Sequence, residues 1–199
     1  MLQSISRSTV IAATSLVMLI VGSEPVVWAH GDVKHLKGNY DFTVHVSFAT
    51  DVTGFDSNLA RLGGGTTNNG IASGTVQYNG DGTGSAAIQF LRVNHTSNGV
   101  GQQPVEQGEL TCTLTYTVDA DHSFSVQETC TGTIIAGAFD GQTILASTIT
   151  FRGKIAQGGD ILLITDTVPD VETRTRTDGV NNFTTYSVGG RSGVAIKVK

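Results

Sequence analysis

The sequence lacks the motifs that identify the common classes of enzyme. After residue 30 no long segment has helical periodicity, which argues against βαβ units and the doubly wound folds built from them. Gly-x-Ser-x-Gly does not occur, so the strained serine turn of an α/β hydrolase is excluded. The run Gly63-Gly-Gly65 precedes no helical segment and therefore lacks the helix N-terminus that a phosphate loop uses. We expect no catalytic residue.

Positive charge and metal-binding side chains are also scarce. Lysine and arginine number 12 against 17 aspartates and glutamates, giving a net charge of −5, whereas nucleic-acid-binding proteins normally carry a basic face. The chain has two cysteines, and their positions in facing strands indicate a disulfide rather than a metal site. An N-terminal His30 would resemble the copper-binding residue of lytic polysaccharide monooxygenases, but the chain after residue 29 has no tryptophan. We expect no nucleic-acid partner, no cofactor and no metal.

One apolar run stands at the start of the chain, and no second run of membrane length follows. It covers Val10 to Val21, and Val27-Trp-Ala29 after it suits a signal peptidase. We predict a signal peptide over residues 1–29 with cleavage after Ala29, and one domain over residues 30–199. The protein would be secreted or periplasmic, with no membrane partner after cleavage. An uncleaved membrane anchor is the alternative.

Two alternating segments, 110–118 and 124–130, predict a β-hairpin with a buried face. Folding the chain back about Asp121 aligns both apolar faces in one register. In an exported protein, two cysteines that face each other in this way indicate a disulfide, which contributes about 3 kcal/mol in the chain-entropy model. The pairs that this register predicts are Cys112 with Cys130, Tyr116 with Val126, and Val118 with Phe124.

Period-two alternation recurs along the rest of the chain and predicts an all-β fold. We expect a single antiparallel β-barrel of about eight or nine strands; a β-sandwich is the alternative. The Gly- and Asn-rich stretch around residues 63–70 is expected to be the longest loop, and 94–107 a second polar loop. The expected strands are 40–48, 71–78, 83–93, 110–118, 124–130, 143–151, 161–165, 171–177, 183–188 and 193–198.

A few residues resemble lipocalin-type (calycin) barrels. Gly38-Asn-Tyr40 resembles their Gly-x-aromatic opening, although the aromatic is Tyr rather than Trp, and Thr165-Asp166 lies where such barrels often turn. The resemblance implies that Arg191 packs over the ring of Tyr40. The chain also resembles uncharacterised bacterial exported proteins that share a Gly-x-Tyr-x-Phe opening, a turn such as Asn79-Gly-Asp-Gly82 and a Cys-x-Gly strand. That group implies no activity.

Glu128 is the first candidate ligand-binding residue, because the hairpin register places it on the apolar face together with Tyr116. An unpaired buried carboxylate is costly, so it must find a partner, take up a proton or face water in a cavity. Arg92 is in phase with Ile88 and Phe90 and is expected to reach inward as the partner of Glu128. A glutamate at the barrel rim, or a misassigned face, is the alternative.

The strand over 171–177 has no apolar face, because Glu172, Arg174 and Arg176 alternate with threonines. Such a strand lines a wet cavity or lies at a solvated edge. In a cavity, the two guanidinium groups would select an anionic or carboxylate ligand. On a solvated edge, they would form ion pairs that contribute little.

These residues favour a non-catalytic binder of a small, partly apolar or anionic ligand. The ligand site would comprise Glu128, Arg92, Arg174, Arg176 and Tyr116, around a cavity of a few hundred Å³. One alternative is a structural or protein-interaction module that presents its Gly/Asn-rich loops. The other is a barrel isomerase or cyclase, which would need Glu128 with a raised pKa beside a second ionisable group.

Overall fold

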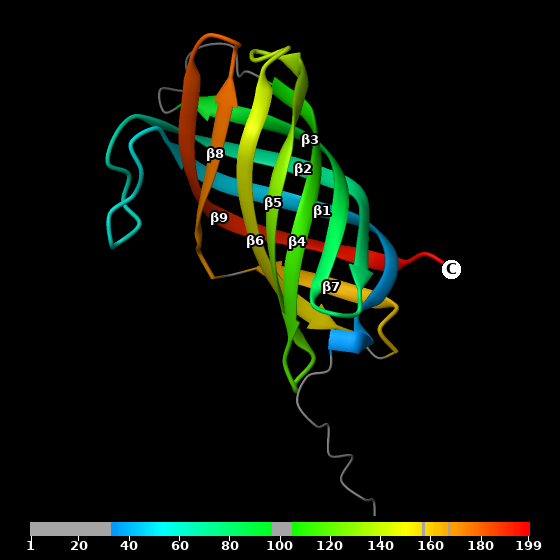
Figure 1. The fold of residues 1–199 in the computed structure, drawn as a ribbon. Coiled ribbons are helices and arrows are strands. Elements are labelled where there is room, and N and C mark those ends of the chain that lie inside the picture. The colour runs from blue at the N-terminus through cyan, green and yellow to red at the C-terminus, as the bar shows by residue number, and fades with distance from the viewer. Residues whose placement is uncertain (1–32, 97–104, 157, 167) are drawn as a thin grey trace, which may run out of the picture.

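A computed structural model describes residues 33–96, 105–156, 158–166 and 168–199 as one antiparallel sheet that closes on itself (Figure 1). The predicted signal peptide lies outside the described residues. A 3-10 helix, η1 (Val33–His35), precedes the first strand. The strands are β1 (Lys37–Asp51), β2 (Gly65–Asn79), β3 (Thr83–Thr96), β4 (Val105–Val118), β5 (Ser123–Gly137), β6 (Thr143–Ile155), β7 (Ile161–Asp166), β8 (Val171–Thr177) and β9 (Asn182–Lys197).

Closure of the sheet confirms the barrel and excludes the sandwich. Each strand from β1 to β6 pairs with the next strand along the chain, and β9 pairs with β1. Strands β7 and β8 are both short and share one position in the ring, because each pairs with β6 on one side and with β9 on the other. Nine strands therefore occupy eight positions around the barrel.

The alternation along the strands separates an interior from an exterior face, as a closed sheet requires. In β4, every second residue from Glu106 to Val118 is buried, while the residues between them are exposed. The inward residues of all strands form one apolar core. In Figure 1, β4, β5 and β6 run along one wall, and β1, β2 and β3 cross behind them at a steep angle.

The predicted hairpin register is confirmed. Cys112 pairs with Cys130, Tyr116 with Val126, and Val118 with Phe124. The two cysteines form a disulfide with their Cα atoms 4.0 Å apart, and both side chains are buried in the interior. The disulfide therefore ties β4 to β5 from inside the barrel, close to the middle of both strands.

Replacing both cysteines by alanine is expected to lower the free energy of unfolding by about 3 kcal/mol, because the crosslink no longer restricts the unfolded chain. Urea denaturation of both proteins measures the difference. The matched control is a double alanine variant of Thr113 and Thr129, which pair on the outer face of the same strands. A loss below about 1 kcal/mol for the cysteine variant would contradict the prediction.

Tyrosines and η1 close one end of the barrel, which we call the tyrosine end. Tyr78 packs edge-to-face against both Tyr40 and Tyr116, with ring centroids 5.6 and 5.0 Å apart. The Tyr116 hydroxyl donates a hydrogen bond to the Leu36 carbonyl at 2.7 Å, and the Tyr40 hydroxyl donates to the Gly159 carbonyl at 2.6 Å. These contacts fix η1 and the β6–β7 turn across this end.

Two predicted loops and one predicted strand break were wrong. Residues 65–70 belong to β2 rather than to a loop, and the long connection is 52–64. Of the predicted loop 94–107, residues 94–96 lie in β3 and 105–107 in β4, while 97–104 lie outside the described residues. The two last predicted strands form one strand, β9. Pairing with neighbouring strands on both sides overrides the weak strand propensity of Gly and Asn in β2.

The expected contact between Arg191 and Tyr40 is also wrong. Arg191 lies over the ring of Phe48, 4.8 Å from its centroid, whereas Lys197 lies 5.8 Å from the centroid of Tyr40. The register explains why Lys197 takes this place instead of Arg191, because β9 runs antiparallel to β1 and places Lys197 opposite Tyr40.

In the part of the chain that the structure describes, no helix has the length and apolar character to cross a membrane.

Candidate functional site

The interior of the barrel contains a cavity of about 100 Å³, which is smaller than the few hundred Å³ expected. Aromatic and aliphatic side chains form most of its wall, including Phe42, Phe48 and Phe90. Phe42 faces inward but is only half-buried, because it borders this space. The polar residues of the wall are Arg92, Glu128, Ser147, Thr148, Glu172, Thr173, Arg174, Ser187 and Arg191.

Three arginines surround one glutamate, away from the tyrosine end of the barrel. Glu106 on β4 is fully buried, and Arg92 Nη2 on β3 donates to its two carboxylate oxygens at 2.7 and 2.8 Å. From β8, Arg174 Nη1 donates to Glu106 Oε1 at 3.3 Å, and Arg176 Nη1 lies 4.0 Å from Oε2. We call these four residues the arginine cluster.

The arginine cluster carries an excess of positive charge, with three guanidinium groups against one carboxylate. Arg176 is only 8% exposed, and its Nε and Nη1 have no hydrogen-bond partner among the described residues; the same holds for Arg92 Nε. Burial, together with the charge of Arg92, lowers the pKa of Arg174 to about 9. The cluster is therefore short of negative charge and of acceptors.

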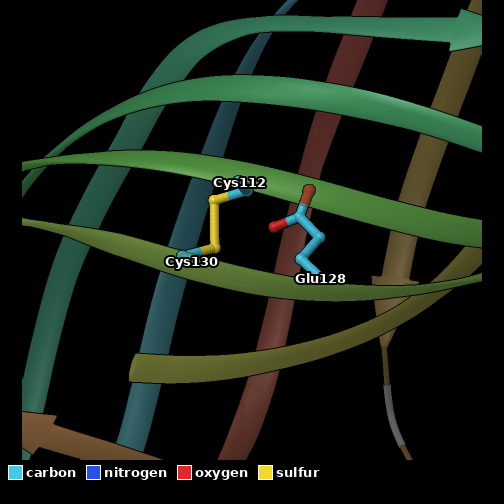
Figure 2. Close-up of side chains that lie close together, drawn as sticks. All are labelled: Cys112, Glu128 and Cys130. Atoms are coloured by element: carbon cyan, nitrogen blue, oxygen red, sulfur yellow. A yellow bond between two sulfur atoms is a disulfide. The ribbon is translucent and has the colours of Figure 1, made fainter. Parts of the chain in front are cut away.

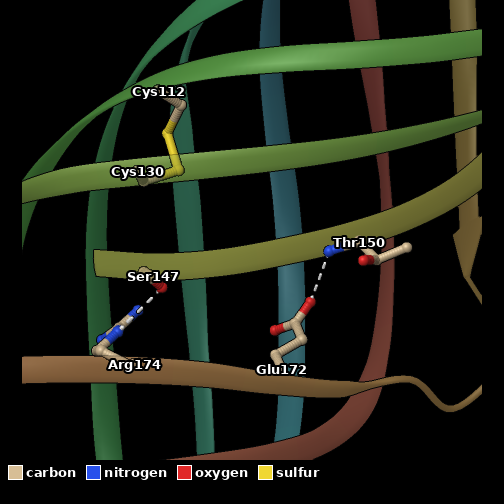
Figure 3. Close-up of a disulfide and its surroundings, with 6 residues drawn as sticks. All are labelled: Cys112, Cys130, Ser147, Thr150, Glu172 and Arg174. Atoms are coloured by element: carbon tan, nitrogen blue, oxygen red, sulfur yellow. Dashed lines mark hydrogen bonds between the residues drawn. A yellow bond between two sulfur atoms is a disulfide. The ribbon is translucent and has the colours of Figure 1, made fainter. Parts of the chain in front are cut away.

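Aromatic rings support the guanidinium groups. Arg174 lies 5.1 Å from the centroid of Phe90, and Arg92 lies 5.9 Å from the same ring. Arg176 lies 4.1 Å from the centroid of Phe139, in the turn between β5 and β6. Arg174 Nε also donates a weak hydrogen bond to the Ser147 hydroxyl at 3.4 Å (Figure 3). Arg92 and Arg174 line the cavity, so an anion in it can reach both.

A second ion pair, between Glu172 and Arg191, lies in the same cavity wall. Arg191 Nη2 donates to Glu172 Oε2 at 2.6 Å, and Arg191 Nη1 donates to the Thr150 carbonyl at 2.8 Å. The other oxygen of Glu172 accepts the backbone N–H of Thr150 at 2.9 Å (Figure 3). Because both ions are paired and hydrogen-bonded, this pair is saturated and contributes no net charge.

Glu128 lies beside the disulfide and projects into the barrel interior (Figure 2). The sulfurs of Cys112 and Cys130 and a carboxylate oxygen of Glu128 lie within 4.8 Å of one another. Glu128 is 3% exposed, and this burial raises its pKa to about 7; Glu172 raises the pKa further, while Arg191 opposes the shift. Glu128 is therefore protonated in a substantial fraction of the molecules at neutral pH.

The structure places three of the five predicted site residues, Arg92, Arg174 and Glu128, in the cavity wall, but Arg92 and Glu128 are not paired. Arg176 lies beside Glu106 and does not line the cavity. Arg92 forms an ion pair with Glu106, whereas the sequence predicts Glu128 as its partner. Arg174 and Arg176 point inward, and Glu172 beside them is buried, so this part of β8 is not a solvated edge. Tyr116 takes part in the packing of the tyrosine end and does not line the cavity.

Sequence reasoning missed Glu106 and the pairing of Arg191 with Glu172. Glu106 lies in a segment that the sequence predicts as loop, because Asn, Gly and Gln precede it. The alternation of Glu106, Gly108 and Leu110 was the signal that β4 begins earlier. No family model, curated protein or solved structure matches the chain.

Proposed function

We propose that this protein is an exported, non-catalytic β-barrel that binds a small, partly apolar anion. The observation that carries the proposal is the arginine cluster beside an apolar cavity. Two of its guanidinium groups line the cavity, and the cluster has two more positive charges than negative ones. Buried charges are normally paired, so a carboxylate seated on Arg92 and Arg174 would supply the missing anion.

The wall of the cavity limits the polarity and the size of the rest of the ligand. Rings from Phe42, Phe48, Phe90 and Phe151 offer apolar contact, and the volume of about 100 Å³ favours a compact molecule. A short chain or a single ring with one carboxylate meets both conditions.

The calycin resemblance and the export of the chain remain part of this proposal, and a buried disulfide is compatible with an oxidising compartment.

Isothermal titration calorimetry with 3-phenylpropanoate tests the proposal. We expect binding to the wild-type protein and at least about tenfold weaker binding to Arg174→Gln, because one charged hydrogen bond to the carboxylate is lost. Arg152→Gln is the matched control, since Arg152 pairs with Asp166 and Asp170 and does not line the cavity. Equal affinity for the neutral 3-phenylpropanamide would contradict the proposal.

A barrel isomerase or cyclase is a second candidate, because Glu128 combines a pKa near neutrality with a position in the cavity wall. General acid–base catalysis favours such a pKa. Glu172 and Arg191 are charged groups that interact electrostatically with Glu128, but they are paired with each other. Recovery of a chemically altered compound after incubation with the protein, and not with Glu128→Gln, would favour this candidate over the binder.

An interaction module is a third candidate, supported by the connection over residues 52–64. Val52 and Leu62 are exposed there, although the base of the connection is firmly held. The buried Asp51 carboxylate accepts the backbone N–H groups of Thr53, Gly54 and Gly63 at 2.7 to 3.1 Å. Exposed apolar groups on a fixed loop are typical of recognition surfaces.

A further inference from the structure

The carboxyl group of Glu128 has no protein partner within the described part of the chain. No described residue forms a hydrogen bond or an ion pair with it, although it is 3% exposed. The disulfide sulfurs lie within 4.8 Å of a carboxylate oxygen of Glu128, and they are poor hydrogen-bonding groups (Figure 2). A buried polar group without a partner is unfavourable, so a group that satisfies Glu128 would have to come from the cavity that it lines.

The charged groups near Glu128 are already paired, so a neutral group suits the space beside its carboxyl. Arg191 on β9 and Glu172 on β8 influence Glu128, but each is held by the other at 2.6 Å. Tyr78 on β2 is also close enough to interact electrostatically with Glu128, and the disulfide covers the β4 side. None of these groups brings an unpaired charge to Glu128.

Building on the proposed function, we propose that the ligand carries a second polar group, a hydroxyl, which hydrogen-bonds to Glu128 while its carboxylate binds Arg92 and Arg174. A hydroxyl can accept a hydrogen bond from the protonated acid and can donate one to the carboxylate, so it suits both forms of Glu128. An ammonium group would enter a cavity that Arg92 and Arg174, two members of the positively charged arginine cluster, already line.

The strand register places the two contacts a short molecule apart. Glu128 lies opposite Ile149 on β6, and Arg174 lies opposite Ser147 on the same strand. Their Cα atoms are thus separated by two strand spacings and two residues, roughly 12 Å on a flat sheet. Both side chains point into the barrel, which shortens the span between their polar ends. One ring with a short acid chain and a ring hydroxyl is of this size class.

Calorimetric comparison of three probes tests the inference: 3-phenylpropanoate and its 3-hydroxyphenyl and 4-hydroxyphenyl analogues. We expect at least one hydroxylated probe to bind the wild-type protein about tenfold more tightly than the parent acid, because it satisfies Glu128. In Glu128→Leu this preference should disappear while the parent acid still binds. Glu128→Gln, which retains a donor and an acceptor, should keep part of the preference.

The outcomes separate this inference from the function on which it rests. Equal affinity for all three probes, or a preference that survives in Glu128→Leu, would overturn the hydroxyl contact and leave the anion site intact. Tighter binding of 3-[4-(aminomethyl)phenyl]propanoate than of either hydroxylated probe would also overturn it, in favour of a cationic group. Failure of every carboxylate to bind would overturn the anion-binding function and this inference with it.

Discussion

Glu106→Gln is expected to lower the free energy of unfolding by about 3–5 kcal/mol, more than any other single change considered for this protein. Glu106 is fully buried and is the shared partner of Arg92, Arg174 and Arg176. The glutamine has nearly the same shape, so the packing is kept while the buried guanidinium group of Arg176 and the half-buried ones of Arg92 and Arg174 lose their counter-charge. Chemical denaturation of wild type and variant at one pH measures the effect.

Glu109→Gln supplies the control for this comparison, because Glu109 lies on the exposed face of the same strand. Its stability should stay within about 0.5 kcal/mol of the wild type. Removing one positive charge as well, in the double variant Glu106→Gln with Arg176→Met, should restore part of the stability. If Glu106→Gln cost less than about 1 kcal/mol, the arginine cluster would not depend on this carboxylate, and the account of its charge would be wrong.

The second large effect is a loss of stability with rising pH that is specific to Glu128. Burial raises the pKa of Glu128 from 4.5 in the unfolded chain to about 7 in the folded protein. Between these values the folded state holds a proton that the unfolded state has released, so the free energy of unfolding falls as pH increases. The contribution is fully present below about pH 4.5 and is lost as pH rises through about 7. Its total size is about 3 kcal/mol.

The measurement is the difference in unfolding free energy between wild type and Glu128→Gln from pH 4 to pH 8. Other carboxyl groups also titrate, such as Asp166, whose pKa burial raises, but they are present in both proteins and cancel in the difference. We expect the wild type to lose about 3 kcal/mol relative to the variant over this range. Parallel pH profiles for the two proteins would show that Glu128 does not titrate differently in the folded state.

The interior and exterior faces of the barrel could be predicted from the sequence because they depend on local alternation. The hairpin around Asp121 is the clearest case, since its two cysteines and its apolar residues support a single register. The interior positions of Glu128 and Arg92 follow from the same alternation. Period two is a property of the strand itself, and it survives errors in the order of strands.

The ionic partners could not be predicted, because they depend on which strands meet across the interior. Arg174 on β8 and Glu106 on β4 are 68 residues apart in the chain and are not on paired strands. Their contact follows from the closure of the sheet, which alternation alone does not specify. The beginning of β4 could not be predicted for a different reason. Residues 94–107 are rich in turn-forming residue types, and the pairing of β3 with β4 overrides this preference at residues 105–107.

The tyrosine end has a practical consequence for handling the protein. Val33 in η1 accepts a hydrogen bond from Tyr116 at this end, and Lys197 of β9 pairs with Tyr40 there. Both the start of the described chain and the end of the last strand therefore lie at the tyrosine end, remote from the arginine cluster. An affinity tag, a fluorophore or a sensor surface attached at either point would lie at the tyrosine end, so the arginine cluster would face away from it.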